Sequence, residues 1–251
     1  MAEPLLQTRG ITKSFGALKA SDAISLDLRP GEIHALIGPT GAGKSTLIKQ
    51  IAGNMQPDSG TVHFLGQDVT ALDTVARARL GLGRTFQISA LAMDFTVLQN
   101  AVLGALGARG DVMRFFRPVM KDRTLVARAH EALERVGLQD HAAMRTAELS
   151  HGQRRQLEVA VALTLKPKAF LMDEPMAGLG AGGSKRLTGF LDGLRAEAPI
   201  LLVEHDMDAV FALADRISVL VYGQVIATGT AAEIRANPDV RRAYLGEEDA
   251  A

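Results

Sequence analysis

The chain of 251 residues contains no cysteine, and its only aromatic residues are nine phenylalanines and two tyrosines. The absence of cysteine excludes a disulfide framework, thiol catalysis and a zinc site built on thiolates. Basic and acidic residues are equal in number, with 28 of each, so no nucleic-acid partner is expected. No run approaches the roughly 18 apolar residues that cross a bilayer, and the first ten residues lack the layout of a signal peptide. We therefore expect a soluble chain. If it works at a membrane, another protein must hold it there.

Apolar residues still make up 47% of the chain, which is ample for a buried core. Short apolar stretches alternate with helical stretches, a pattern typical of an α/β domain with a largely parallel sheet. Several early stretches alternate with polar residues and are joined by turns, which indicates an antiparallel layer near the N-terminus. The predicted strands cover residues 5–12, 23–28, 32–37, 61–65, 83–86, 169–172, 200–204 and 216–221.

Between about residues 88 and 165 the strand pattern fades. Residues 97–106, 123–136 and 152–165 carry apolar side chains at helical spacing instead. We interpret 88–165 as an α-helical subdomain inserted in the α/β core of a single domain that covers 5–246. The acidic tail after residue 245 is expected to fray.

Residues 38–46 are the most informative segment of the sequence. They follow the apolar run 33–37 and have the spacing of a phosphate-binding loop, with the strand before it and the helix after it that the motif requires. Glycines let successive N–H groups converge on phosphate oxygens, and the start of the helix adds free N–H groups and a partial positive charge. We expect a nucleoside triphosphate here, with Lys44 on the β- and γ-phosphates and Ser45 on Mg²⁺. The predicted binding residues are Gly38, Pro39, Thr40, Gly41, Ala42, Gly43, Lys44, Ser45 and Thr46.

A second apolar strand, 169–172, ends in the adjacent carboxylates of Asp173 and Glu174. Open α/β sheets bind their ligands at the C-terminal ends of strands, so both carboxylates should lie beside the phosphate loop. We expect Asp173 to hold Mg²⁺, directly or through water, and Glu174 to orient or deprotonate the attacking water. The alternative is a plain acidic loop beside a proline.

Two further polar features lie at the ends of predicted elements. Ser150 precedes a long helix, and the small residues beside it leave the helix N-terminus open to an anion; a simple helix cap is the alternative. His205 follows the strand 200–204 at another C-terminal strand end, where it is either catalytic or structural. The other five histidines have no comparable placement.

These motifs occur in the order found in ATP-binding-cassette (ABC) ATPases, and the resemblance covers nearly the whole chain. It implies a P-loop NTPase (RecA-like) core with an N-terminal antiparallel β layer, and ATP and Mg²⁺ as ligands. Glu174 corresponds to the catalytic base, His205 to the switch histidine that contacts the γ-phosphate, and Lys44 to the loop lysine. Gln87 corresponds to the Q-loop glutamine, which senses Mg²⁺ and the membrane partner.

The same resemblance assigns the family signature and an adenine contact. The signature is implied to face the ATP of a second subunit, and it comprises Ser150, His151, Gly152 and Gln153. Phe15 falls where an aromatic side chain stacks on adenine, or it is one more core phenylalanine. His151 stands where the commonest signature has glycine. Gly180 replaces the Asp or Asn usual in the D-loop, which links the two active sites, so we expect weaker cooperativity between them.

Five segments are similar to the ATPase subunits of branched-chain amino acid importers: 84–87, 152–158, 203–207, 237–240 and 243–248. The similarity implies an ATP-hydrolysing subunit that energises a membrane importer, at the cytoplasmic face of the inner (plasma) membrane. Urea importers and the lipopolysaccharide-export ATPase share parts of the pattern and stay as alternatives. So do a soluble ABC protein acting on nucleic acid or ribosomes, and a non-hydrolysing regulatory module.

The implied partners are a second ABC ATPase subunit, identical or paralogous, and transmembrane permease subunits. A periplasmic or extracellular solute-binding protein is implied indirectly. An apolar set after Gln87 would either dock on the permease or pack in the core. It comprises Ile88, Leu91, Met93, Phe95, Val97 and Leu98, with Phe115 and Phe116 as an extension.

Overall fold

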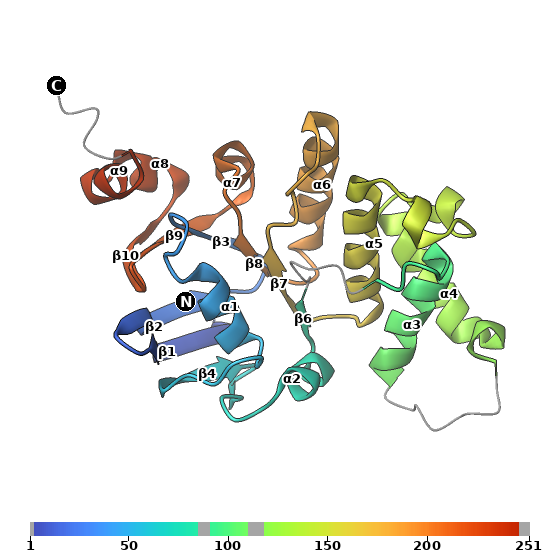
Figure 1. The fold of residues 1–251 in the computed structure, drawn as a ribbon, viewed down its shortest axis with the longest axis horizontal. Coiled ribbons are helices and arrows are strands. Elements are labelled where there is room, and N and C mark those ends of the chain that lie inside the picture. The colour runs from blue at the N-terminus through green and yellow to red at the C-terminus, as the bar shows by residue number, and fades with distance from the viewer. Residues whose placement is uncertain (1–2, 85–90, 110–117, 246–251) are drawn as a thin grey trace.

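The computed structural model describes residues 3–84, 91–109 and 118–245 (Figure 1). Near the N-terminus, a four-stranded sheet pairs its strands antiparallel in the order β2-β1-β4-β5. Its strands are β1 (Leu6–Phe15), β2 (Leu18–Leu28), β4 (Ser59–Phe64) and β5 (Gln67–Asp68).

The core is a six-stranded sheet in the order β10-β9-β3-β8-β7-β6. All neighbouring strands pair parallel except β10, which lies antiparallel to β9 at one edge. The strands are β3 (Ile33–Ile37), β6 (Leu82–Arg84), β7 (Ala169–Asp173), β8 (Ile200–Val203), β9 (Arg216–Val221) and β10 (Gln224–Gly229).

Helices cover both faces of the core sheet. Helix α1 lies between the two sheets, while α3, α4 and α5 gather at the end of the molecule away from β1 and β2 (Figure 1). The helices are α1 (Lys44–Ile51), α2 (Thr74–Leu80), α3 (Val97–Arg109), α4 (Arg123–Arg135), α5 (His151–Thr164), α6 (Ala181–Leu194), α7 (Met207–Leu213), α8 (Ala231–Ala236) and α9 (Pro238–Leu245), with short 3-10 turns η1 (Val119–Lys121), η2 (Gln139–His141) and η3 (Thr146–Glu148).

The central strands are buried on both faces, as parallel strands between helices must be. In β7, Leu171 packs in the cluster that contains α1 and the antiparallel sheet, whereas Phe170 and Met172 pack with α3, α4, α5 and α6. The period of two in a strand alternates the side chains between these two clusters. Within the described residues, no helix has the length and apolar character needed to span a membrane.

This architecture confirms the predicted α/β class, its antiparallel layer and the group of helices between β6 and β7. Some predicted bounds are wrong. Strand β1 continues to Phe15, β2 begins already at Leu18, and β8 stops before Glu204. Strand β10 was not predicted, because none of its residues is buried and its sequence carries no apolar pattern.

A largely buried polar cluster lies at the N-terminal ends of β3 and β9. Arg216 forms ion pairs with Asp27 (2.8 Å) and Glu32 (2.9 Å). The His34 ring donates to the carbonyl of Asp27 through Nδ1 (2.7 Å), and its Nε2 lies 2.8 Å from the hydroxyl of Ser218. Burial, with the nearby Arg216 cation, lowers the pKa of His34 to about 4. His34 is therefore neutral at physiological pH, and this end of the sheet is a structural network away from the phosphate loop.

Candidate functional site

Three neighbouring parallel strands bring the predicted site residues to one edge of the core sheet. Strand β3 leads into the phosphate loop, β8 leads to His205, and β7 leads to Glu174. Strand β8 lies between β3 and β7, although it comes last in the sequence. Because the carboxyl ends of parallel strands meet at the same edge, motifs more than a hundred residues apart converge here.

The phosphate loop is held close to its neighbours by glycines. Gly43 precedes helix α1 with φ +107°, and a Cβ there would lie 2.1 Å from the carbonyl oxygen of Ala20. A Cβ on Gly38 would lie 2.1 Å from the carbonyl oxygen of Leu220. Among the described residues, no side chain caps the N-terminus of α1, so its first-turn N–H groups can meet phosphate oxygens.

Lys44 begins α1 and curls back over the loop. Its Nζ donates to the carbonyl oxygens of Gly38 (2.6 Å) and Pro39 (3.1 Å). Burial lowers the pKa of Lys44, while the carboxylates of Glu174 and Asp173 act in the opposite direction. The lysine predicted for the phosphates and the two predicted carboxylates therefore share one electrostatic environment.

The carboxylate of Asp173 fits the metal role that the sequence predicts. Its side chain is buried, and its Oδ1 has no hydrogen-bond partner among the described residues. Burial and then the Glu174 carboxylate raise the pKa of Asp173, and nearby Arg84 and Lys44 oppose this. An orphaned buried carboxylate oxygen suits a cation or a cation-bound water. In the part of the chain that the structure describes, no group of three or more histidine, cysteine or acidic side chains is placed to hold a metal ion by itself.

Glu174 and His205 are brought together. The Oε2 of Glu174 lies 3.3 Å from the Nε2 of His205, and both side chains keep some exposure to solvent. Glu174 adopts φ +51°, a left-handed conformation that is uncommon for a residue with a side chain. Its N–H donates to the carbonyl of Val203 (2.8 Å), which ties the segment after β7 to the end of β8.

A buried carboxylate that the sequence analysis did not select lies under this pair. Glu204 is 2% exposed, and its Oε1 accepts from the N–H of Met176 (2.8 Å), while its Oε2 accepts from the N–H of His205 (3.2 Å). Burial raises the pKa of Glu204. A charged residue that ends an apolar strand was the only sequence signal that could have identified it.

Phe15 is 48% exposed at the tip of the β1–β2 hairpin, so the alternative that it is a core phenylalanine is wrong. It pairs with Leu18, and two residues further on the carbonyl of Ala20 closely approaches Gly43 of the phosphate loop. Tyr222 is another exposed aromatic side chain near this loop. It was not predicted, and it joins Pro39, Thr40 and Gly41 in lining a cavity of about 810 Å³.

The predicted signature lies at the N-terminus of α5. Ser150 caps that helix in a capping box, in which Ser150 Oγ accepts from the N–H of Gln153 (3.3 Å) and Gln153 Oε1 accepts from the N–H of Ser150 (2.9 Å). The His151 ring packs against Gly178, where a Cβ would lie 2.6 Å from the ring. Figure 1 shows α5 and α1 on opposite sides of β7, so this segment is not brought to the chain's own phosphate loop.

The apolar residues after Gln87, predicted either to dock on the permease or to pack in the core, include both buried and exposed side chains. Val97 is fully buried, and Leu91 and Leu98 pack against the core, whereas Phe95 is 42% exposed. The buried amide of Asn100 holds this segment, since it accepts from the N–H of Ala92 (2.9 Å) and donates to the carbonyls of Ala92 and Thr96. Gln87, Ile88, Phe115 and Phe116 lie outside the described residues.

Family models and known proteins match this chain over most of its length. The family model described as ABC transporter matches residues 21–177, and the one described as branched-chain amino acid ATP-binding cassette transporter matches residues 224–250. The chain is 38% identical to the high-affinity branched-chain amino acid transport ATP-binding protein LivG of Escherichia coli K12, covering 98% of this chain and all of the relative. It is 34% identical to the corresponding protein BraF of Pseudomonas aeruginosa, with the same coverage.

A solved structure shares the architecture over nearly the whole length. It is the ADP conformation of MJ1267, an ATP-binding cassette of an ABC transporter, with a TM-score of 0.88 and 32% identity over 98% of this chain and all of that one. The family match covers more than half of the chain and joins the phosphate loop to the Asp173–Glu174 strand end. The chain therefore belongs to the ABC transporter family, as one of its nucleotide-binding ATPase subunits.

Proposed function

We propose that this chain hydrolyses ATP to energise a membrane importer for branched-chain or related amino acids. The observation that carries the proposal is the convergence of the phosphate loop, Asp173, Glu174 and His205 at the edge of strands β3, β8 and β7. The names of the full-length relatives and the separate match over residues 224–250 support the amino acid class. The membrane subunits and a solute-binding protein would select the individual solute.

In the proposed reaction, Glu174 accepts a proton from the water that attacks the γ-phosphate, and His205 hydrogen-bonds a γ-phosphate oxygen. Lys44 and the free N–H groups at the start of α1 counter the charge that develops on the phosphates. Mg²⁺, when bound, supplies a cation that neutralises phosphate oxygens. Ser45, Asp173 and Gln87 are the residues that we propose to hold it, directly or through water.

The other half of the reacting site would come from a second cassette. Ser150 and Gly152 lie at an exposed helix end away from the chain's own loop, which supports their binding the nucleotide of a partner. Phe15 is proposed to stack on adenine, because it is exposed and its hairpin contacts the loop. The assembled pair would work at the cytoplasmic face of the membrane, where Phe95 and its neighbours offer an apolar contact for the permease.

The first experiment replaces the proposed base. Glu174→Gln keeps the shape of the side chain but cannot take the proton, so the variant should bind ATP normally, release no phosphate and remain as a closed dimer. Glu131→Gln makes the same change on the exposed side of α4 and should leave turnover unchanged. Wild-type turnover in Glu174→Gln would show that another group is the base.

The second experiment identifies the partners. Tagged protein recovered from native membranes in mild detergent should bring two polytopic permease subunits and a second cassette, as read by mass spectrometry. Recovery with ribosomes or nucleic acid would overturn the importer proposal. Recovery with subunits of a lipid exporter would keep the ATPase but change its direction and cargo.

A further inference from the structure

We propose that Glu204 is a positioning residue, which fixes the backbone of both Glu174 and His205 for hydrolysis. The inference rests on the proposed roles of those two residues. Glu204 itself is too deeply buried to meet the nucleotide, being only 2% exposed. Its carboxylate instead joins the segment after β7 to the segment after β8.

The first reason is the backbone conformation of Glu174. A left-handed conformation is unfavourable for a residue with a Cβ, and it persists only where the surrounding structure holds it. On its N-terminal side, the Glu174 N–H is bound to the carbonyl of Val203 at 2.8 Å. On its C-terminal side, Pro175 has no N–H, so the next backbone donor is Met176. That N–H is bound by Glu204 Oε1 at 2.8 Å.

The second reason is the other oxygen of the same carboxylate. Oε2 accepts from the N–H of His205 at 3.2 Å, and the N–H of Asp206 also interacts with the side chain. Hydrogen bonds from N–H groups to a charged acceptor are stronger than neutral ones. A single rigid carboxylate therefore sets the separation of two backbone segments whose side chains meet at 3.3 Å.

Burial of this carboxylate has an energetic cost, and the structure indicates what opposes it. Burial raises the pKa of Glu204, while the N–H groups of Met176, His205 and Asp206 act in the opposite direction. A buried carboxylate is tolerated only when its oxygens are hydrogen-bonded. Each of these bonds is directed at one of the two segments that carry the proposed catalytic pair.

The test separates positioning from general stability in the transporter complex purified from native membranes. Glu204→Ala should lower kcat by about tenfold or more, because a displacement of about 1 Å at a reacting group can cost about a hundredfold. The ATP Kd should change by less than about threefold, since the phosphate loop is built on β3 and α1 and its contacts remain. Glu204→Gln should be intermediate. Its amide oxygen still accepts from Met176, but its NH₂ group cannot accept from His205.

Glu32→Gln provides the matched control. Glu32 is also a largely buried carboxylate, with 12% of its side chain exposed, but it lies at the opposite end of the sheet and pairs with Arg216. This variant should lose thermal stability and keep its kcat. The proposal is overturned if both Glu204 variants keep wild-type kcat. It is also overturned if Glu32→Gln lowers kcat as much as Glu204→Gln, since the effect would then be general.

A double variant gives a second readout. If Glu204 acts through His205, then Glu204→Ala should reduce kcat less in a His205→Ala background than in the wild type. Equal reductions in the two backgrounds would overturn the proposal that Glu204 positions His205. Failure of the proposed function is distinct, because it would appear as normal turnover by Glu174→Gln whatever the Glu204 variants do.

Discussion

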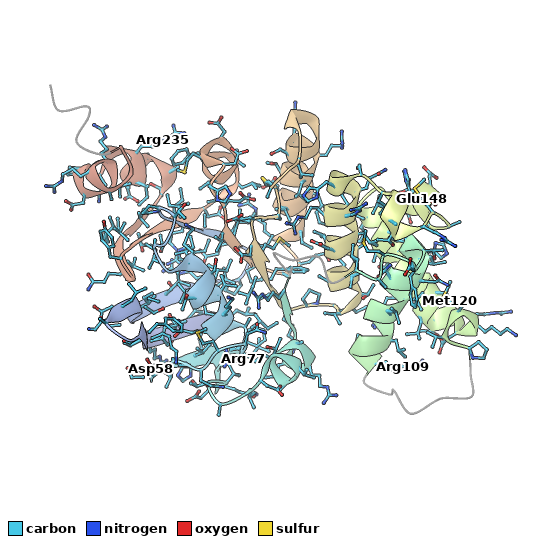
Figure 2. All side chains as sticks on the ribbon, viewed as in Figure 1. Asp58, Arg77, Arg109, Met120, Glu148 and Arg235 are labelled. Atoms are coloured by element: carbon cyan, nitrogen blue, oxygen red, sulfur yellow. The ribbon has the colours of Figure 1, made fainter. Side chains whose placement is uncertain are left out.

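Arg77 of α2 is the largest fully buried side chain in the described structure, and its replacement makes a strong test of how the phosphate-loop helix is held. Its Nη1 donates to the carbonyls of Gln50 (2.7 Å) and Ile51 (2.6 Å), which end helix α1. Nη2 and Nε donate to the carbonyls of Thr70 (2.8 Å) and Leu72 (3.0 Å). Figure 2 labels Arg77 between α1 and α2. The guanidinium thus neutralises the negative end of the helix that carries Lys44 at its start.

The loss of unfolding free energy in Arg77→Ala is the difference between the hydrogen bonds lost and the desolvation cost removed. Hydrogen bonds that involve a charged group contribute about 1.5–3 kcal/mol each, so the four bonds set an upper limit of about 12 kcal/mol. Burying the cation costs several kcal/mol, and this cost disappears when Arg77 is replaced by alanine. Water can also hydrogen-bond some of the carbonyls that lose the guanidinium. We therefore expect Arg77→Ala to lower the free energy of unfolding by about 3 kcal/mol. This is a large fraction of the roughly 5–15 kcal/mol that stabilises a typical domain.

Urea unfolding followed by circular dichroism measures the effect. With a denaturant slope of about 3 kcal/mol/M, the midpoint should fall by about 1 M. Arg79→Ala is the control, since Arg79 is exposed on the same helix and its loss should cost within about 0.5 kcal/mol. Arg77→Lys should be intermediate, because an ammonium lacks the planar fork that serves four carbonyls. An unchanged midpoint in Arg77→Ala would refute the view that this guanidinium holds the end of α1.

Three further predictions concern other parts of the chain. Because the pKa of His34 is about 4 when folded and about 6.5 when unfolded, unfolding binds a proton between these values. Stability should therefore fall by about 3 kcal/mol as the pH drops from 6.5 to 4, and urea titrations of His34→Gln should show a weaker dependence. Gly43→Ala should raise the ATP Kd more than Gly41→Ala, measured by titration, because its Cβ would meet a carbonyl oxygen whereas that of Gly41 meets nothing within 4 Å. Gly180→Asp should raise the Hill coefficient for ATP in the assembled transporter, since Gly180 has room for a side chain; an unchanged coefficient would contradict the D-loop argument.

The parts of the site that could be predicted are those whose chemistry needs neighbours in the sequence. A phosphate loop needs its glycines, lysine and serine within a short consecutive stretch, so the motif can be recognised from the sequence alone. Asp173 and Glu174 could be predicted because they end an apolar strand, and the edge of an α/β sheet is where such ends meet. The same reasoning places His205 after β8, and the structure brings it to Glu174.

The residues that were missed depend on partners far along the chain. Arg77 and Asn100 look like ordinary polar residues of amphipathic helices, yet both are buried. Arg77 binds carbonyls about 26 residues away, and Asn100 also donates to Thr146, 46 residues away. Hydropathy periodicity treats a polar residue as a surface residue, so a buried polar group that is satisfied by the tertiary fold leaves no signal in the pattern. Glu204 carried only the weak signal of a charged residue at the end of an apolar strand, and its partner Met176 lies 28 residues away.

The exposure of the proposed catalytic pair argues that one chain carries only part of a working site. In the single chain, the His205 side chain is 61% exposed and that of Glu174 is 22% exposed. Solvent at this exposure screens the charges that must stabilise the reacting phosphate, because Coulomb energies fall with the local dielectric constant. Catalytic electrostatics reach full strength only in a site from which bulk water is excluded. A second cassette that brings the Ser150 end of its α5 over this edge would exclude water and add N–H donors in one step, which explains physically why turnover should require the dimer.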